Sequence, residues 1–438
     1  MPGATCTCAS AWSLRRPGPT VAVSDGEACD RGFSGRFVIS FAKWMRGALI
    51  WAALMVVAAG VAHAEPVGSN DPAQVVAVVP QSGELAGVGA QLVEVMVWAA
   101  EDAGAELVVI DSEADPGALA TELERALRSP TVVGVVGPLR ASPAGVVAAL
   151  SARAQVPALL LSGVEGVEAR SPWAFRARMS VGEQAAFAAR WAFERWPQGR
   201  VGVMAPLSDY GDEAARAFVG AWNERGGRVA ALARYRSGET QFTPVVETLL
   251  GQRMRLERGR EVAGRRPDRW ETLRAGQPRI EALDVLLLAD FDDAVARQAP
   301  FITREDALQQ TQLLGLAGWR GQRLEQAGQE LAGAIFFDTF GGLEQGGAAE
   351  GFVLAFEARF ERAPTTVEVE VFDLVVFLAL RSRADANRAL RSPEGFEGIT
   401  GRWRFDSRGA PLREPLALRV TEDGRWVPLS NDAPRETP

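Results

Sequence analysis

Residues 75–89 read VVAVVPQSGELAGVG. The first five side chains are all apolar, which is typical of a strand buried on both faces, and Pro80 ends the run. The serine and glycines that follow indicate a turn, and a helix is predicted over residues 87–103. A buried strand followed at once by a helix is the repeating unit of a parallel α/β sheet.

The same unit recurs along the chain. Further strands are predicted at residues 107–110, 132–136, 157–161, 201–204, 229–235, 285–288, 313–316 and 334–337. Helices are predicted at residues 117–127, 144–153, 211–225, 242–250, 349–360 and 366–381. Asp115-Pro116 and Ser142-Pro143 each place a capping side chain before a proline, which predicts helix starts there. Segments 400–405 and 416–420 have hairpin character.

These strands are too many for one sheet of ordinary size. The sequence therefore predicts an α/β fold of two doubly wound, Rossmann-like lobes with a hinge and a ligand cleft at the carboxyl ends of the strands. Lobe one is predicted to comprise residues 73–178 and 340–395. Lobe two is predicted to comprise residues 180–336 and 398–432, with 433–438 as a tail.

Residues 251–280 interrupt this rhythm with nine arginines and several acidic residues. One interpretation is an inserted, solvated helical arm of lobe two. The other is a docking surface for an anionic partner, such as a phospholipid head group or an acidic protein.

The N-terminal region contains the pattern of a secretory signal peptide. Residues 45–47 carry a positive charge, residues 48–61 are apolar or small, and residues 62–64 read AHA. Cleavage is predicted after Ala64, with export to the periplasm. A membrane anchor is the alternative, but fourteen helical residues rise only about 21 Å, less than a ~30 Å hydrocarbon core. Residues 1–44 are predicted to be a mis-set start or a disordered extension.

Cleavage of this leader removes every cysteine, lysine and histidine from the chain. All three cysteines precede Met45, Lys43 is the only lysine and His63 is the only histidine. No cysteine follows the apolar segment, so the protein is predicted not to be lipidated. What remains has 41 arginines against 52 acidic residues, a net charge of −11. Such an acidic chain is a poor candidate for binding nucleic acid.

The mature chain therefore lacks the side chains that most catalysis needs. Ser-His-Asp and Cys-His catalysis require an imidazole, zinc sites require His or Cys, and Schiff bases require Lys. No cofactor or metal is predicted. A hydrolase with two carboxylates facing across a cleft remains as an alternative, but the sequence favours a binding protein that is not an enzyme.

Candidate ligand groups follow the predicted strands of lobe one. Ser82, Gly83 and Ser142 lie near helix starts, and Ser162 and Gly163 follow the fourth strand. Hydroxyls and backbone N–H groups at helix starts suit a carboxylate. Each serine has the alternative role of an ordinary helix cap.

Candidates from lobe two are Tyr210, Asp290 and Trp319. Tyr210 is predicted to cover and hydrogen-bond a ligand, or to pack at the hinge. Asp290 is predicted to meet an ammonium group, or to form a turn. Trp319 is predicted to line the cleft or to lie in the core. The spacing of Asp290, Asp292 and Asp293 does not match a calcium-binding EF-hand loop.

Several short motifs come in the order found in a known family. They are Pro80–Gly89, Gly137-Pro138, Val156-Pro157, Ala174-Phe175-Arg176, Asp209-Tyr210-Gly211 and Gly226–Val229 with Tyr235. This series resembles the leucine-binding-protein-like, type I periplasmic binding proteins. In the amino-acid receptors of that family a carboxylate-binding serine follows the Gly-Pro motif, and Ser142 stands one place late for that role.

Later motifs are similar to the receptor-like domain of penicillin-binding-protein activators. They are Asp290–Ala294, Ala299-Pro300, Leu314-Gly315, Gly318-Trp319, Gly333–Asp338, Pro364-Thr365 and Glu370–Asp373. The whole resemblance covers about residues 73–425, although the lipidated cysteine and the N-terminal helical repeats of some activators are absent.

The resemblance implies two functions. The first is a receptor that binds a small polar, amino-acid-like ligand for the membrane component of an ABC transporter. The second is a regulator that contacts a cell-wall synthase.

Overall fold

The computed structural model describes residues 71–251, 280 and 282–429. The predicted leader and nearly all of the arginine-rich insertion lie outside these residues. Within the described part, no helix is long and apolar enough to cross a membrane.

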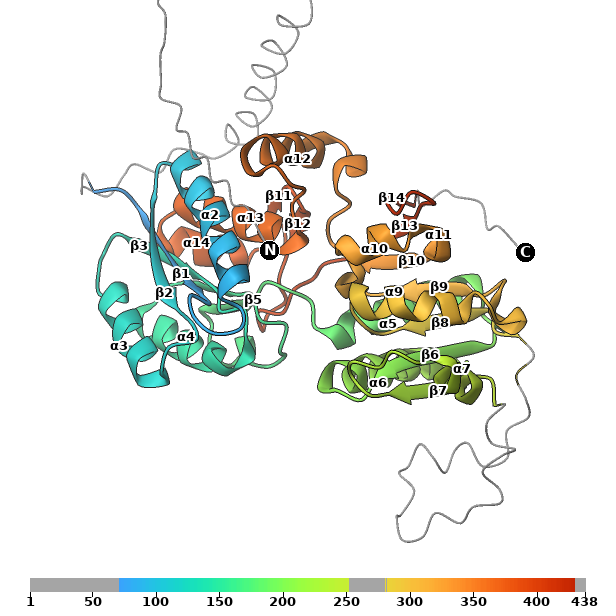
Figure 1. Cartoon of the computed structure of the whole chain (residues 1–438). Helices are drawn as coiled ribbons and strands as arrows, with labels where there is room; N and C mark the ends of the chain where they lie inside the picture. The colour runs from blue at the N-terminus through green and yellow to red at the C-terminus, as the bar shows by residue number, and fades with distance from the viewer. Residues whose placement is uncertain (1–70, 252–279, 281, 430–438) are drawn as a thin grey trace, which may run out of the picture. The chain divides into compact units, whose positions relative to one another are not determined.

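The first sheet has five parallel strands in the order β2-β1-β3-β4-β5 (Figure 1). The strands are β1 (Gln74–Val79), β2 (Glu106–Asp111), β3 (Val132–Val136), β4 (Ala158–Leu160) and β5 (Ala174–Arg176). Strand β5 is not among the strands predicted from the sequence, which marks these residues only as part of a motif.

Successive side chains of β1 point to opposite faces of the sheet, and both faces are covered. Val75, Ala77 and Val79 pack with helices α2 (Ala86–Asp102), α12 (Gly347–Phe360), α13 (Thr366–Ala379) and α14 (Arg383–Leu390). Val76 and Val78 pack with α3 (Pro116–Leu127) and α4 (Ala141–Ala154). This two-sided burial explains why the run is uninterrupted.

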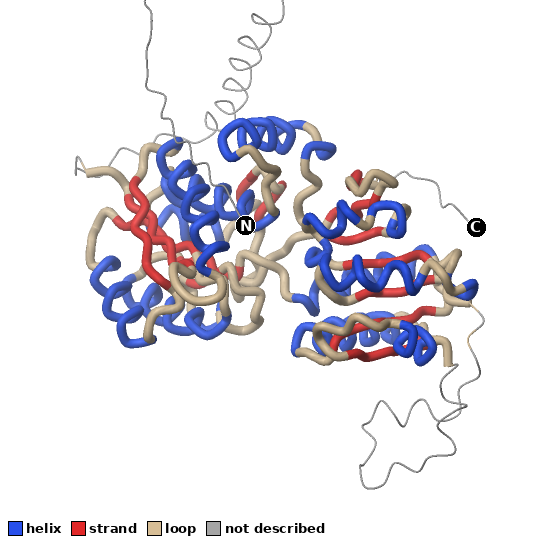
Figure 2. The backbone as a smooth tube through the Cα atoms, in the orientation of Figure 1, coloured by secondary structure: helices blue, strands red, loops and turns tan. Residues whose placement is uncertain are grey.

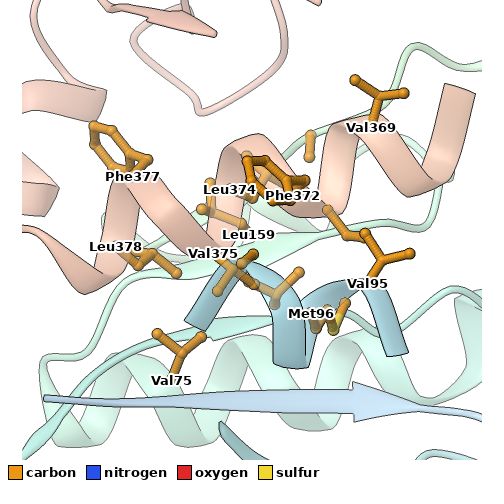
Figure 3. Close-up of a cluster of buried hydrophobic side chains, with 14 of the residues drawn as sticks. Val75, Val95, Met96, Leu159, Val369, Phe372, Leu374, Val375, Phe377 and Leu378 are labelled. Carbon is orange, nitrogen blue, oxygen red and sulfur yellow. The ribbon is translucent and has the colours of Figure 1, made fainter. Parts of the chain in front are cut away.

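Helices α2 and α13 meet over the first sheet. Figure 3 shows Val75 of β1, Met96 of α2 and Val375 of α13 in one cluster of side chains, with Leu374 and Phe372 further along α13. All five side chains are buried. The C-terminal part of the chain thus completes a core that the N-terminal strands begin.

The second sheet has seven strands in the order β14-β13-β10-β9-β8-β6-β7. The parallel strands are β6 (Val201–Pro206), β7 (Val229–Tyr235), β8 (Val285–Leu288), β9 (Gln312–Gly315) and β10 (Ile335–Asp338). Strands β13 (Leu416–Val420) and β14 (Trp426–Pro428) are antiparallel additions at one edge.

Helices cover both faces of this sheet as well (Figure 2). One face packs against α5 (Val181–Arg195) and α6 (Asp209–Glu224). The other packs against α7 (Thr243–Leu249), α9 (Asp292–Ile302), α10 (Gln322–Gln326) and α11 (Gly328–Leu331). Short 3-10 turns are η1 (Glu168–Arg170), η2 (Asp306–Leu308), η3 (Ala317–Trp319) and η4 (Leu343–Gln345). Two sheets with separate cores confirm the predicted doubly wound α/β fold.

Strands β11 (Phe396–Gly398) and β12 (Gly401–Trp403) form a small antiparallel sheet of their own. The sequence assigns residues 398–432 to lobe two, whereas Trp403 and Phe405 pack in the core of the first sheet. The exact boundaries of the lobes stay a prediction.

Side-chain caps were predicted at the starts of two helices of the first sheet, α3 and α4. Asp115 caps α3 as predicted, because its carboxylate accepts hydrogen bonds from Gly117 N and Ala118 N. The predicted cap at Ser142 is wrong: α4 begins at Ala141, the extended Arg140 occupies the N-cap position, and Ser142 lies inside the first turn.

Strand β5 ends in a buried charge. The Arg176 guanidinium donates to Glu168 at 3.2 Å and makes two 2.7 Å bonds to Glu183. Glu183 also accepts from Ser180 N, while Ser180 Oγ accepts from Glu183 N, so that the two residues form the capping box of α5. The end of β5 and the start of α5 are therefore joined through one carboxylate.

A buried carboxylate, that of Glu370 on α13, joins the segments that connect the two sheets. Its Oε1 accepts from Thr339 Oγ1 at 3.0 Å and Arg413 Nη1 at 3.2 Å, and its Oε2 lies 3.1 Å from Arg178 Nε. Arg178 lies between β5 and α5, Thr339 follows β10, and Arg413 precedes β13. Burial raises the pKa of the Glu370 carboxyl, and the two arginines oppose that rise.

Replacing Glu370 tests this network. Glu370→Ala leaves Arg413 buried without its carboxylate, and breaking a buried pair in this way typically costs about 3–5 kcal/mol. We expect a loss of that size in urea unfolding. The control is Glu397→Ala, which removes an exposed pair with Arg402 and should cost less than about 1 kcal/mol. Equal losses in the two variants would contradict the role given to Glu370.

Candidate functional site

In doubly wound sheets, ligands bind beyond the carboxyl ends of the parallel strands. Every site residue predicted from the sequence follows such an end. Ser82 and Gly83 follow β1, Ser142 follows β3, Ser162 and Gly163 follow β4, Tyr210 follows β6, Asp290 follows β8, and Trp319 follows β9. Since β1, β3 and β4 are neighbours in one sheet and β6, β8 and β9 in the other, the residues form two sets, here called the first and second rim.

The turn after β1 is held in shape by Asp111 at the end of β2. Ser82 Oγ donates to Asp111 Oδ2 at 2.7 Å, and the backbone N–H groups of Gln81 and Glu113 donate to Oδ1 at 2.8 and 3.0 Å. Burial tends to raise the pKa of the Asp111 carboxyl, but these hydrogen bonds outweigh burial and hold that pKa below its usual value. Gly83 takes the left-handed conformation, with φ of 73°. The exposed loop is thus preorganised.

Two helix starts on the first rim lack a capping side chain. The N-cap residues of α2 and α4, Leu85 and Arg140, make no side-chain cap hydrogen bond, and neither first turn contains an acidic residue. In contrast, Asp115, Ser180 and Ser208 cap α3, α5 and α6. The uncapped N–H groups after β1 and β3 carry the positive end of each helix dipole.

Arg140 adds a cation to this rim. Its guanidinium lies 3.3 Å from Glu84 and 3.5 Å from Glu113. The sequence shows Arg140 only as part of the stretch after Gly137-Pro138. Its place at the N-cap position, which nothing in the local pattern indicates, is what brings it to the rim.

The serines of the first rim differ in exposure. Ser142 is exposed on the first turn of α4. Ser162 is buried, and its Oγ accepts from Val164 N at 3.3 Å within the turn after β4. A side chain at Gly163 would place its Cβ 3.2 Å from Met179 O, so the backbone passes close by.

The second rim carries a pair of aromatic rings. The rings of Tyr210 and Phe291 lie 4.7 Å apart between centroids, at an angle of 34°. Gly318 lies against both, because a Cβ there would come within 3.1 Å of the Tyr210 hydroxyl and of the Phe291 ring. Burial is the main cause that raises the pKa of Tyr210, followed by the charges of Asp290 and Glu213. Phe291, which the sequence shows only inside a motif, was not predicted as a site residue.

Asp290 is engaged inside the protein. It is only 9% exposed. Its Oδ2 accepts from the Tyr235 hydroxyl at 2.6 Å, and its Oδ1 accepts from Phe291 N at 2.9 Å. Gln298 donates in turn to the Tyr235 hydroxyl at 2.7 Å. These are the bonds of a turn-forming aspartate, one of the two roles that the sequence left open.

Trp319 lies in the core. Its side chain is fully buried, its Nε1 donates to Leu288 O at 3.0 Å, and its ring stacks on Phe336. Gly315 accommodates the indole, since a Cβ there would lie 2.1 Å from the ring. This favours the packing role over a place in the ligand site.

A small cavity lies among the connecting segments rather than at the predicted residues. Its polar wall consists of Arg178, Gln184, Asp338, Thr339 and Glu370. Among the described residues, no three His, Cys, Asp or Glu side chains are grouped to hold a metal ion.

Comparison with known proteins agrees with this architecture. A model of the family described as periplasmic binding protein matches residues 72–425. No curated protein matches the chain.

Solved structures share the fold at low sequence identity. A protein described as a branched-chain amino acid ABC transporter from Rhodospirillum rubrum is 20% identical; the match covers 82% of this chain and 100% of that one, with a TM-score of 0.66. The substrate binding protein of a branched-chain amino acid transporter from Streptococcus pneumoniae, in complex with isoleucine, is 16% identical, with coverages of 82% and 99% and a TM-score of 0.58. A solute binding protein of an ABC transporter from R. palustris, in complex with benzoate, is 15% identical, with coverages of 82% and 96% and a TM-score of 0.57.

The internal role of Asp290 is testable through its partner. Tyr235→Phe removes the hydroxyl that both Asp290 and Gln298 contact, and an unmet buried polar group typically costs about 1–3 kcal/mol. We expect a loss of that size in chemical denaturation. The control is Thr121→Ala on the exposed face of α3, where the Thr121 hydroxyl donates to Gly117 O; a surface change of this kind stays within about 0.5 kcal/mol. If Tyr235→Phe matches the control, the bond to Asp290 contributes little.

Proposed function

Because the chain belongs to the periplasmic binding protein family, as its match over residues 72–425 shows, we propose that it is an exported solute-binding protein. Its ligand is a small polar molecule that carries a carboxylate group, the class that includes amino acids. The bound solute is delivered to the membrane component of an ABC transporter. The protein binds its ligand without transforming it.

The observation that carries this proposal is the pair of uncapped helix starts on the first rim. Helices α2 and α4 follow the neighbouring strands β1 and β3, and no side chain caps either one. Open N–H groups at the positive end of a helix are a ready site for an anion. Ser82 and Ser142 add hydroxyls beside these two helix starts.

The second rim supplies the other side of the site. Tyr210 offers a hydroxyl, and the neighbouring ring of Phe291 offers an apolar surface. The isoleucine and benzoate named with the two similar structures both carry a carboxylate on an apolar body. That chemistry agrees with a polar first rim and a partly apolar second rim.

The alternative function, a penicillin-binding-protein activator-like regulator of cell-wall synthesis, draws no support from the proteins compared above. The arginine-rich segment that could dock a partner lies outside the described residues. A docking role for that segment stays a prediction of the sequence.

Export is tested by the N-terminus of the mature protein. We expect protein recovered from the periplasm to begin at Glu65, because signal peptidases read the small side chains of Ala62 and Ala64. Mass spectrometry of the intact protein measures this. Ala64→Trp should block cleavage and leave the longer chain attached to the membrane. A mature protein that still contains residues 45–64 would contradict export by this route.

Ligand binding is tested first by thermal shift with amino acids and other small carboxylates, since a ligand that binds only the folded state raises Tm. Tyr210→Ala should then weaken the compound found by about 5- to 150-fold in calorimetry, if its hydroxyl bonds the ligand and is buried with it. Tyr210→Phe separates the hydroxyl from the ring. Unchanged affinity in Tyr210→Ala and in Asp290→Ala would remove both residues from the site.

A further inference from the structure

The rings of Tyr210 and Phe291, here called the aromatic platform, give the second rim a surface that is open to solvent. Phe291 is 49% exposed, and its ring centroid lies 4.7 Å from that of Tyr210. Gly318 lies against both side chains, because a Cβ there would come within 3.1 Å of each. Leu207, which is 58% exposed, follows β6, the neighbour of the strand that Phe291 follows. Phe291 is thus supported by its neighbours, and about half of its surface stays open to a ligand.

Negative charge lies beside this platform. Asp209 is exposed in the first turn of α6, and Asp292 lies in the first turn of α9. Neither carboxylate forms an ion pair within the described part of the chain, whereas the neighbouring Asp293 has Arg297 at 2.9 Å. Asp292 accepts only from the backbone N–H of Arg323, which leaves its charge in place. A cation brought to the platform is therefore attracted by charges that no arginine of the described residues neutralises.

The groups at the platform favour one kind of cation. A primary ammonium group that leaves water needs acceptors for three N–H bonds, but the buried Asp290 already uses both its oxygens on Tyr235 and on the Phe291 N–H. An alkylated ammonium group has no N–H bonds to satisfy. Its charge is attracted to the face of an aromatic ring, and its alkyl groups cover the exposed apolar surface of Phe291 and Leu207. The platform therefore suits a cation whose nitrogen is covered by alkyl groups.

We infer that the ligand is a betaine, a zwitterion that carries a carboxylate and a fully alkylated ammonium group. The inference rests on the proposed function and narrows its ligand class. The open N–H groups of α2 and α4 bind the carboxylate, and the aromatic platform binds the cation with Asp209 and Asp292 beside it. Ordinary amino acids bind less tightly, because a ring face offers no acceptor to their N–H groups.

Matched compounds separate the charge of the ligand from its shape. Trimethylglycine is compared with glycine, its parent amine, and with 3,3-dimethylbutanoate, in which carbon replaces the charged nitrogen. N,N-dimethyl-L-proline is compared with L-proline. In calorimetry on the purified protein, each betaine should bind about 2- to 30-fold more tightly than the compounds it is compared with, the range expected of a cation on an aromatic face.

The outcomes distinguish this inference from the proposed function. If glycine, L-proline or 3,3-dimethylbutanoate binds as tightly as its betaine or more so, the inference is overturned and the proposed function stands. If none of the five compounds binds, the inference is also overturned. The proposed function itself fails only if a wider panel of amino acids and small carboxylates leaves Tm unchanged as well.

Substitutions at Phe291 test the ring itself. Phe291→Ala should weaken the binding of trimethylglycine by about 2- to 30-fold, because the aromatic face is lost. Phe291→Tyr keeps that face and should retain most of the affinity, whereas Phe291→Leu keeps apolar surface without it and should not. The control is Leu354→Ala on α12, which is similarly exposed at 47% and lies on a helix of the other sheet. Full affinity in Phe291→Leu, or an equal loss in Leu354→Ala, would overturn the assignment.

The charge beside the platform is tested by Asp209→Asn, which keeps the shape of the side chain. This variant should weaken trimethylglycine by about two- to fivefold at low ionic strength, the size of an exposed charge pair, and should not weaken 3,3-dimethylbutanoate. The control is Asp102→Asn, which removes an exposed carboxylate at the other end of α2 from the first rim. No loss in Asp209→Asn, or the same loss in both variants, would overturn the role given to Asp209.

Discussion

The buried carboxylate of Glu370 is the interaction on which the connections of this fold depend. A charge removed from water is stable only when it is paired and hydrogen-bonded, and Glu370 finds its partners on three separate segments through Arg178, Thr339 and Arg413. Arg413 also donates to Thr400, whose hydroxyl donates to the buried Asp373. The three segments that connect the sheets are therefore coupled, because each supplies a partner to the same buried carboxylate of Glu370.

The two rims differ in how their polar groups are used. On the first rim, helix α2 and helix α4 start without side-chain caps, so their N–H groups remain available to a bound anion. On the second rim Ser208 caps α6 and Asp290 is bonded to Tyr235, while α9 starts without a side-chain cap but has Asp292 and Asp293 in its first turn. Both rims lie at the carboxyl ends of parallel strands, and the chemical difference between them comes from a few turn residues.

Much of the fold follows from local patterns. An apolar run such as Val75–Val79 indicates a strand buried on both faces, because a strand with one face in water alternates apolar and polar side chains. Strand β5 could not be predicted from such a pattern, since it has three residues and ends in Arg176, whose burial depends on ion pairs to Glu168 and Glu183. The site was less predictable. The role of Asp290 depends on Tyr235, which is 55 residues away in the sequence, and the cap pattern at Ser142 gave no sign that Arg140 takes its place.

The capping box of α5 has a mechanical consequence. Glu183 fixes Ser180 at one end of the first connecting segment, and Arg176 anchors the other end at β5. The chain between these anchors is short, and each residue in it has only two backbone angles, φ and ψ, that rotate easily. Between the anchors, Ala177 N donates to Leu160 O and Arg178 O accepts from Arg176 Nη1. Hydrogen bonds therefore restrain the few φ and ψ angles of this passage, and the chain here is a short, stiff link between the two sheets.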